Sequence, residues 1–287
     1  KSVGYLNEGR YKSYKYVDGP KFNFRIGSRK IFGRGDSWYN TLTSSYSLTA
    51  SIGRKDFWLI KELGNDSTWA NDDTIKLKHG GIKHSAQLSA PQTFFNWLTL
   101  NPSLSFREDW IFNYKMKNES GEVKEVEGFK RRFTWNSSLS ANTKIYGLFP
   151  VKVGRLNAIR HIIKPSISYK YQPDFSDQKY GGNLYFQRDA LDEPYDYFNG
   201  SYVGSTSKTE KQTYRLSVNN DFQAKIRGEK DNYSKSTFLS WNSSISYDAF
   251  KDSLNFSEMI SNVRVKNLSG NDLFRVNMYH NFYKLDE

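Results

Sequence analysis

The chain has 287 residues, of which 42 are Lys or Arg and 30 are Asp or Glu, so its formal net charge is +12. It contains no cysteine, which excludes disulfide frameworks, thiolate metal sites and cysteine nucleophiles. Its 20 Tyr, 20 Phe and 7 Trp residues accompany a mean hydropathy of −0.75. Because disordered chains are poor in aromatic residues, this composition predicts a folded chain despite its low hydropathy.

No segment is apolar enough for a membrane-spanning helix. The longest apolar run of this kind covers residues 57–60, whereas a spanning helix needs about 18 residues. The first five residues lack the apolar core of a signal peptide. We therefore expect either a processed chain or a piece of a longer protein.

Apolar and polar residues alternate along most of the chain. In residues 42–53 the even positions are mostly apolar, whereas the odd positions are Thr, Ser or Gly. Successive residues of a strand point to opposite faces, so the pattern predicts roughly ten strands, each with one apolar and one polar face. No segment shows a convincing helical period. The other alternating ranges are 82–90, 98–116, 132–145, 214–227, 239–248 and 274–282, with weaker cases at 22–26, 161–172 and 259–266.

The connections between these ranges help to choose between a soluble sandwich and a membrane barrel, because both have strands with one apolar face. Long connections are expected at 53–81, 117–128 and 173–212, a moderate one at 249–258 and short ones at 91–97, 228–236 and 267–272. Long and short mostly alternate, as in outer-membrane barrels, although the intermediate segment 146–160 does not fit. We predict an all-β, antiparallel up-and-down transmembrane β-barrel with roughly ten or more strands, present here in part.

The composition of the connections and the positions of the rings agree with this prediction. Residues 117–125 are charged, and residues 65–67 and 71–73 are rich in Asn and Asp, so these connections belong in water. Aromatic residues at the ends of strands form girdles at the two membrane interfaces of barrels. The expected girdle residues are Trp38, Tyr39, Phe57, Trp58, Phe94, Phe95, Trp97, Tyr195, Tyr197 and Phe198.

The sequence has no recognisable catalytic, metal or nucleotide motif. There is no HExxH, no GxSxG and no Walker-type loop. We predict a protein that is not an enzyme, with no catalytic residues, no metal and no cofactor. Partly buried or interfacial roles are expected for the four histidines, which are His79, His84, His161 and His280.

The net charge has two interpretations. Lys and Arg with interleaved rings suit a soluble β-protein that binds nucleic acid. However, basic residues such as Lys83, Arg132 and Lys170 recur on the predicted polar strand faces along the whole chain. In a barrel they would line the lumen and rims, where they would attract anionic solutes or lipid phosphates, or be balanced by Asp and Glu. We therefore expect no nucleic acid partner.

The middle of the chain carries the most distinctive motif. Residues 146–150 read YGLFP, and residues 158–175 read AIRHIIKPSISYKYQPDF. An Arg-His pair that leads into a proline-bearing strand ending in Tyr-x-Tyr-x-Pro resembles the barrel of the LptD (OstA) family, particularly its Bacteroidota-type branch. Residues 98–106 resemble another strand of those barrels. The motif residues, which have a structural or lipid-contacting role by this resemblance, are Arg160, His161, Pro165, Tyr169, Tyr171 and Pro173.

The resemblance implies a protein of the bacterial outer membrane that belongs to the lipopolysaccharide translocon. The implied partners are lipopolysaccharide, a plug lipoprotein similar to LptE, the periplasmic bridge proteins and outer-membrane lipid. The chain lacks the family's periplasmic jelly-roll domain and its cysteines, and it does not end in an aromatic residue. We therefore expect residues 1–287 to be one domain that forms an interior-to-late piece of a larger barrel.

The motif also has a physical interpretation of its own. Pro102 and Pro165 lack an N–H group, so each should mark a bulge, a strand end or a locally opened strand pair. Arg160 and His161 are expected just before the second of these strands, at the periplasmic edge. There they would bind lipid phosphate, pair with a carboxylate or cap a turn. The remaining alternatives for the whole chain are a porin, a TonB-type receptor, a soluble basic β-protein that binds nucleic acid or a barrel enzyme.

Overall fold

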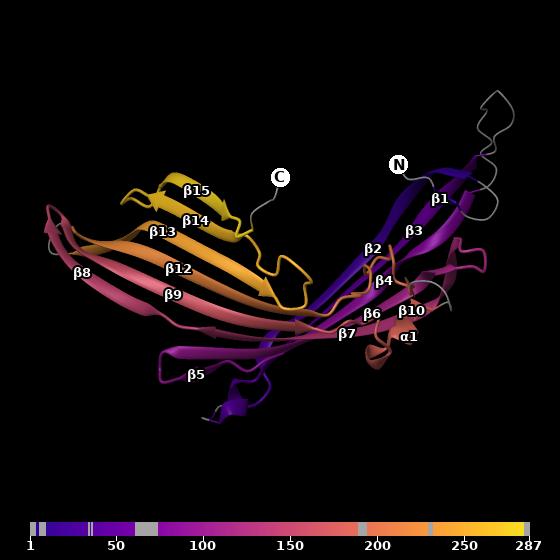
Figure 1. Cartoon of the computed structure of the whole chain (residues 1–287), viewed down its shortest axis with the longest axis horizontal. Coiled ribbons are helices and arrows are strands. Elements are labelled where there is room, and N and C mark those ends of the chain that lie inside the picture. Colours follow the sequence, from indigo (N-terminus) through magenta and orange to yellow (C-terminus); the bar gives the residue numbers. More distant parts are fainter. Residues whose placement is uncertain are drawn as a thin grey trace.

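A computed structural model describes residues 4–5, 10–33, 35, 37–60, 74–188, 194–228 and 232–283, with side chains described from residue 19 onward except at 54–78. Most of these residues belong to one antiparallel sheet of thirteen strands (Figure 1). The strands of this sheet are β1 (Gly4–Tyr5), β2 (Arg10–Lys30), β3 (Thr43–Ile60), β4 (Thr74–Ser89), β5 (Gln92–Phe94), β6 (Leu98–Lys117), β7 (Val123–Asn142), β8 (Ile145–Val153), β9 (Leu156–Gln172), β12 (Lys211–Arg227), β13 (Tyr233–Asp248), β14 (Met259–Lys266) and β15 (Asp272–His280).

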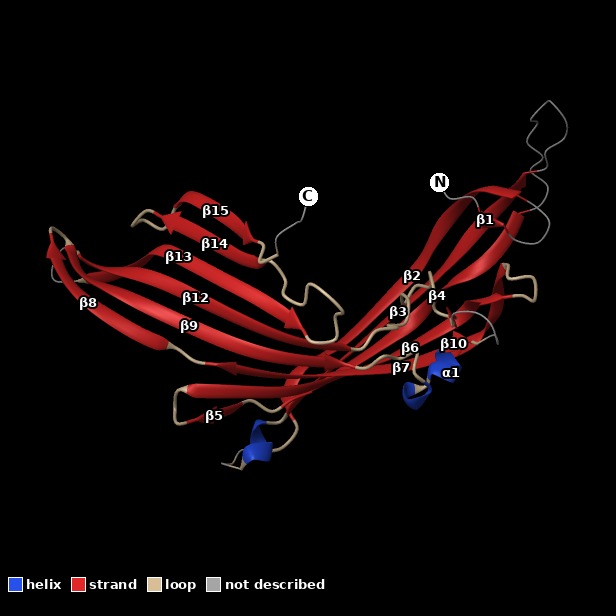
Figure 2. Cartoon of the chain, in the orientation of Figure 1, coloured by secondary structure: helices blue, strands red, loops and turns tan. Residues whose placement is uncertain are grey.

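Helical structure in the described residues is confined to three short pieces, so this part of the chain is almost entirely strand and loop (Figure 2). Two of these pieces, with the two-stranded sheet β10–β11, lie between β9 and β12. No helix in the described residues is both long and apolar enough to span a membrane. The short elements are η1 (Trp38–Thr41), η2 (Gln178–Tyr180), α1 (Gly182–Tyr185), β10 (Phe186–Gln187) and β11 (Tyr195–Asp196).

The prediction of an all-β, antiparallel up-and-down fold is confirmed. The strands of the main path follow the chain in the order β1-β2-β3-β4-β6-β7-β9-β12-β13-β14-β15, and every pair is antiparallel. The sheet is strongly curved and twisted, but β1 and β15 lie at opposite edges and do not pair (Figure 1). The sheet formed by the described residues is therefore open rather than a closed barrel.

Strand pairing assigns each side chain to one of two faces. Ser47 pairs with Ser85, whereas the next residue, Leu48, pairs with His84. This alternation continues across the sheet, and many large side chains of the second set, such as Ile52, Phe133 and Ile167, are exposed. The second set defines the apolar face, which consists of Tyr46, Leu48, Ala50, Ile52, Ile82, His84, Ala86, Leu88, Leu104, Phe106, Glu108, Trp110, Phe112, Phe129, Arg131, Phe133, Leu139, Ile163, Ile167, Tyr169, Tyr214, Leu216, Phe222, Leu239, Trp241, Phe274 and Val276.

The opposite face carries mainly hydroxyl, amide and charged groups, as the alternation predicts. Some of its charges are balanced, because Lys164 lies 2.6 Å from Asp221 and Arg264 lies 2.6 Å from Asp272. We call it the polar face, and it consists of Arg25, Ser45, Ser47, Thr49, Lys83, Ser85, Gln87, Ser105, Arg107, Asp109, Lys130, Arg132, Thr134, Asn136, Arg160, Lys164, Ser166, Ser168, Lys170, Arg215, Ser217, Asn219, Asp221, Gln223, Ser240, Asn242 and Arg264.

The connections fall at two ends of the sheet, and one prediction about them was wrong. Residues 146–160 are not a connection: β8 runs to Val153, a tight turn at 154–155 follows, and β9 begins at Leu156. Gly154 has φ 56°, which suits such a turn. The predicted connection at 117–128 also shortens to 118–122. One end, called the loop end, bears the described residues of the connections 118–122, 173–210 and 249–258, and the other, called the turn end, bears those of the connections 31–42, 90–97, 154–155 and 267–271.

Pro102 and Pro165 each lie opposite an interruption of the neighbouring strand. The carbonyl of Pro165 accepts from the N–H of Thr143, in the gap between β7 and β8, which both pair with β9. The carbonyl of Pro102 accepts from the N–H of Ala90, in the gap between β4 and β5, which both pair with β6. Since a strand residue presents its N–H and C=O to the same neighbour, each proline lacks its donor at the interruption. Of the three predicted alternatives, a bulge, a strand end or a locally opened strand pair, the structure shows the last at both prolines.

The buried hydrophobic cluster does not lie between two layers of sheet. It forms where residues 173–210 cover part of the main sheet, and only Ile111 of its fully buried members belongs to a long strand. This stretch, which we call the inserted segment, also carries α1, β10 and β11. The fold therefore places its one well-packed described core at the inserted segment, and the cluster consists of Ile111, Phe175, Tyr185, Phe186, Phe198 and Val203.

Candidate functional site

A buried ionic cluster on the polar face anchors the inserted segment. Asp109 on β6 and Arg132 on β7 are direct register partners, so both side chains leave the same face next to each other. The Oδ2 atom of Asp109 lies 2.6 Å from Nη2 of Arg132, and its Oδ1 atom lies 2.8 Å from Nε of Arg107. The side chains of Asp109 and Arg132 are 0% and 3% exposed. A buried charge of this kind is tolerated only when it is paired and hydrogen-bonded.

The two arginines also bind the backbone of the inserted segment. Arg107 Nη2 donates to the carbonyl of Val203 at 2.6 Å, and Arg132 Nη1 donates to the carbonyl of Gly204 at 3.1 Å. Arg132 Nη1 also donates to the hydroxyl of Thr206 at 2.7 Å. Each guanidinium thus joins the carboxylate of Asp109 to the segment above it, and this connects residues 203–206 to β6 and β7.

Rings of the inserted segment lie over cations of the sheet. The guanidinium of Arg132 lies 4.5 Å from the centre of the Phe198 ring, and Phe198 is 0% exposed. Lys130 lies 4.0 Å from the ring of Tyr197. The segment therefore covers the cations of the polar face with aromatic faces, which attract positive charge. The two further pairs of this kind are Lys83 with Tyr202 at 4.5 Å and Lys117 with Tyr195 at 5.9 Å.

The shape of the segment is fixed by its own polar contacts. Asp196 is 5% exposed and accepts from the N–H of Phe198 and from both the N–H and the hydroxyl of Thr206. Burial raises the pKa of the neighbouring Tyr195 phenol. A Cβ atom at Gly182 would lie 2.2 Å from the carbonyl oxygen of Ser176, so this position requires glycine. The segment is therefore a built element rather than an open loop.

Two side chains of the segment make the backbone hydrogen bonds that a neighbouring strand would otherwise make. The hydroxyl of Tyr185 accepts from the N–H of Phe133 at 3.1 Å and donates to its carbonyl at 3.0 Å. The amide of Gln187 accepts from the N–H of Lys117 at 2.7 Å and donates to its carbonyl at 2.8 Å. Because free strand edges invite pairing with other chains, these contacts protect β6 and β7 at the loop end.

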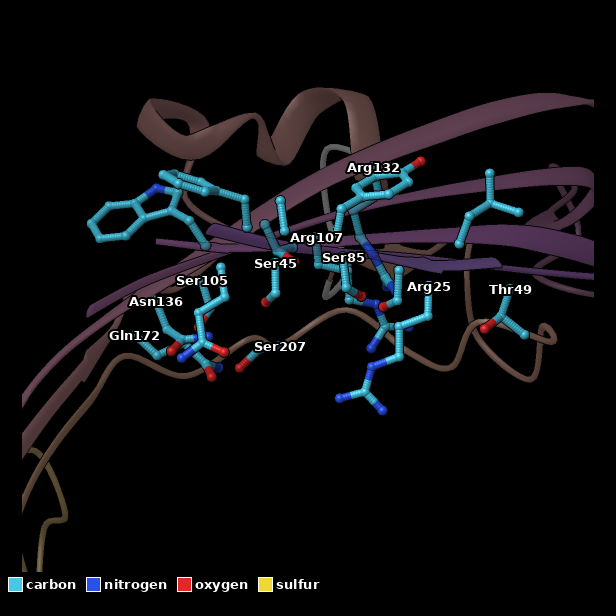
Figure 3. Close-up of a pocket in the computed structure, with 18 of the residues that line it drawn as sticks. Arg25, Ser45, Thr49, Ser85, Ser105, Arg107, Arg132, Asn136, Gln172 and Ser207 are labelled. Atoms are coloured by element: carbon cyan, nitrogen blue, oxygen red, sulfur yellow. The ribbon is translucent and has the colours of Figure 1, made fainter. Parts of the chain in front are cut away.

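A cavity of about 700 Å³ opens on the polar face beside the ionic cluster. Hydroxyl and amide groups dominate its lining, and Ser105, Asn136 and Gln172 point from the strands toward Ser207 of the segment (Figure 3). Arg25 contributes a cation at one side of the cavity (Figure 3). The described residues contain no group of three or more metal-ligating side chains. This lining suits hydrogen bonding to a hydroxylated, partly anionic ligand.

The motif residues Arg160 and His161 lie inside β9 and not before it, so that expectation was wrong. They also face opposite sides. Arg160 lies on the polar face, where its Nε donates to Oε1 of Gln223 at 3.0 Å. His161 lies on the opposite face, stacked 4.1 Å from the ring of Phe222 and with Nε2 3.0 Å from Oδ1 of Asn220. The two residues therefore cannot form one binding site.

The other motif residues continue along β9 toward the loop end and do not converge either. Tyr169 accepts from Gln212 at 2.9 Å, and the ring of Tyr171 lies 5.8 Å from that of Trp135. Pro173 is fully buried at the base of the inserted segment. With Pro165 at the strand interruption, the motif residues extend from Arg160, four residues into β9, to Pro173, just past its end.

The sequence prediction missed the centre of the site. Asp109 was not singled out, and Tyr195, Tyr197 and Phe198 were assigned to an interfacial girdle, which is wrong because they pack on the polar face. From the sequence, an acidic residue within 98–116 could have been paired with Arg132, but identifying that pair requires the register of the two strands. Trp38 and the rings at 94–97 do lie exposed at the turn end, as predicted.

His84, for which a partly buried or interfacial role was predicted, lies on the apolar face. Its Nδ1 is 2.7 Å from the hydroxyl of Tyr46, and its ring is 4.5 Å from that of Trp110. The predicted water-exposed residues 65–67 and 71–73, the side chains of Phe57 and Trp58, and the chain end at 285–287 lie outside the described residues.

The fold and this site define an all-β protein whose single large sheet has one exposed apolar face and one polar face with a hydroxyl-rich cavity. The family model of the LptD protein matches residues 12–283, so the chain belongs to the LptD family. This family acts in lipopolysaccharide transport and assembly, is associated with the outer membrane and is not a known family of enzymes. No curated protein and no solved structure matches the chain.

Proposed function

We propose that this chain forms part of the outer-membrane β-barrel that inserts lipopolysaccharide into the outer leaflet. The observation that carries the proposal is the division of one sheet into an apolar and a polar face, together with membership of the LptD family. An apolar surface of this extent is not stable in water, since soluble monomers rarely expose such patches. Lipid would cover it in a membrane.

The mechanism requires no covalent chemistry. The apolar face meets the acyl chains of the bilayer, while the polar face encloses a hydrated path for the saccharide. The hydroxyl and amide groups of the cavity exchange hydrogen bonds with sugar hydroxyls, and Arg25 attracts acidic groups of the saccharide. The turn end lies toward the periplasm and the loop end outside, as in other outer-membrane barrels.

The proposal also names the partners of the chain and the part of the barrel that it forms. A plug lipoprotein similar to LptE would occupy the polar side, and periplasmic bridge proteins would deliver lipopolysaccharide and the energy for transport. Residues 1–287 would be one domain within a larger barrel, which the unpaired outer edges of β1 and β15 support. Outer-membrane lipid is the third partner.

The motif residues receive separate roles in this proposal. Arg160 lies on the polar face, four residues from the start of β9 at the turn end, and we assign the contact with lipid phosphate to this motif residue. His161, Pro165, Tyr169, Tyr171 and Pro173 act structurally, through ring stacking, the strand interruption, hydrogen bonding and burial.

Depletion of the full-length protein tests the proposal. Lipopolysaccharide on the cell surface, measured by labelling intact cells, should fall and should return when the wild-type protein is expressed again. Unchanged surface lipopolysaccharide would contradict the proposal. High ion conductance by the reconstituted protein, with no effect of depletion on lipopolysaccharide, would favour a porin instead.

A further inference from the structure

One charged pair interrupts the apolar face. In the middle of this face, the charged residues with described side chains are Glu108 on β6 and Arg131 on β7, whereas Arg29, the register partner of Ser44, joins the same face at the turn end of β2. A charged side chain on the lipid-facing surface of a barrel costs about 2–4 kcal/mol at the bilayer midplane and about 0–1 near the interfaces. The energetic cost of this pair therefore depends on its position along the strands, and a low cost would be compatible with a binding site.

Aromatic rings surround the pair, which lies midway along β6 (Leu98–Lys117) and β7 (Val123–Asn142) on the apolar face. The Trp110 and Phe112 rings each lie close to Phe129, with centres 6.2 and 6.1 Å apart. Farther along the sheet a ring row continues at the loop ends of β9, β12 and β13, where Tyr214 lies between Tyr169 at 5.0 Å and Tyr247 at 6.5 Å. Trp and Tyr gather where a barrel leaves the hydrocarbon region. The charged pair lies beside the first group of rings, because Arg131 is the register partner of Trp110 and Glu108 is that of Phe133.

The guanidinium of Arg131 has few polar contacts within the protein. Arg131 is 71% exposed, and its one polar partner among the described residues is Glu108, with Nη1 3.9 Å from Oε1. That separation is too long for a hydrogen bond. Glu108 instead accepts from Nε1 of Trp110 at 2.9 Å. The guanidinium therefore keeps its hydrogen-bond donors for a ligand that approaches from the apolar side.

We propose that Arg131 binds a phosphate of lipopolysaccharide on the outside of the sheet, with acyl chains against Phe112 and Phe129. The guanidinium fork matches a phosphate in two parallel hydrogen bonds, and both phenylalanines are exposed beside it. The assignment to lipopolysaccharide rests on the proposed function, in which the loop end faces the outer leaflet. The carboxylate of Glu108 repels the phosphate and keeps the binding reversible.

Titration of the purified full-length protein in detergent with diphosphoryl lipid A tests this site, with bound lipid counted by native mass spectrometry. Arg131→Gln should weaken binding about tenfold, which corresponds to the loss of a charge-assisted contact. Arg131→Lys should retain part of the affinity, because the charge remains without the fork. Glu108→Gln should strengthen binding, since it removes the repulsion.

The matched control is Arg215→Gln. Arg215 is an exposed arginine on the polar face, where its Nη2 donates to Ser244 at 3.0 Å, so its loss should leave lipid A binding unchanged. Equal binding by Arg131→Gln and wild type, or an equal loss in the control, would overturn the proposal. Equal affinity of the wild type for phosphatidylglycerol would overturn the assignment to lipopolysaccharide. The titration does not depend on surface display, so failure of the proposed function would be seen separately.

Discussion

The two halves of the sheet differ in how they are stabilised. Where the inserted segment packs on the sheet, Asp109, Ile111 and Phe198 are 0% exposed, and ion pairs, rings and apolar side chains pack together as in a soluble protein. In the other half, from β12 to β15, the buried residues are Ala224 and Ser261, and nearly all of β15 is exposed. The first half is stabilised by its own buried core. The second half is stabilised by main-chain hydrogen bonds between strands and by the surroundings that cover its apolar face. Four sets of substitutions test this contrast and the contacts behind it.

The largest effect is expected at the buried ionic cluster. Asp109→Ala removes the carboxylate and leaves Arg132 buried without its counter-charge, which should lower the free energy of unfolding by about 3–5 kcal/mol. Chaotrope unfolding of the full-length protein in lipid vesicles measures this change, and hydrogen exchange should accelerate in residues 203–206. As a control, Lys164→Ala removes a half-exposed partner of Asp221 and should cost about 1 kcal/mol or less. Equal losses would contradict the contrast.

The next effect concerns the half without a core. Leu216 is 50% exposed on the apolar face, and Leu216→Arg should cost about 2–4 kcal/mol if lipid covers it. Ser217→Arg, on the polar face, should cost at most about 1 kcal/mol, through loss of its hydrogen bond to Ser166. Unfolding in vesicles measures both variants. If Leu216→Arg is as stable as Ser217→Arg, the apolar face does not meet lipid.

A smaller effect is expected at the protected edge of β7. Tyr185→Phe keeps the ring but removes the hydroxyl that binds the backbone of Phe133, so it should cost about 1–3 kcal/mol. The amide of Phe133 should then exchange faster. Tyr169→Phe removes a hydroxyl that accepts from one glutamine side chain and should cost less. Unchanged exchange at Phe133 would show that the segment does not protect this edge.

The smallest effect is expected at the strand interruption. Pro165→Ala restores an N–H opposite the gap between β7 and β8, and a new hydrogen bond of about 1 kcal/mol should be nearly offset by the greater freedom of the unfolded chain. The stability should change by at most about 1 kcal/mol, while exchange at Thr143 should slow. Pro102→Ala should act in the same way at Ala90. A large loss of stability in either variant would contradict this account of the two prolines.

Much of the sheet could be predicted from the alternation of residues, but its interruptions could not. The pattern in 42–53, 98–116 and 214–227 identifies strands because each exposes one apolar and one polar face. Residues 146–160 were predicted as a connection because Gly147, Pro150 and Gly154 obscure the alternation. Their strand pairing with β9 becomes visible only once β7 and β8 are seen to share one neighbour.

The candidate site was harder to predict because it depends on contacts between distant residues. The motif on β9 was found as a sequence pattern, yet Arg160 and His161 face opposite sides, since neighbouring strand residues alternate. The pairing of Asp109 with Arg132 follows from register, and register is not written in either strand alone. Phe198 was predicted for a membrane interface but lies buried over Arg132.

The sequence by itself determined the class of structure and the family. Period-two alternation makes strands with two unlike faces, and the absence of a long apolar run excludes spanning helices. Only the tertiary structure decided where charge is buried and where it is free. Asp109 and Arg132 meet beneath the inserted segment, whereas Glu108 and Arg131 stand on the apolar face. These pairs come from adjacent positions of the same two strands, and their different surroundings arise from which face each residue joins and what covers that face.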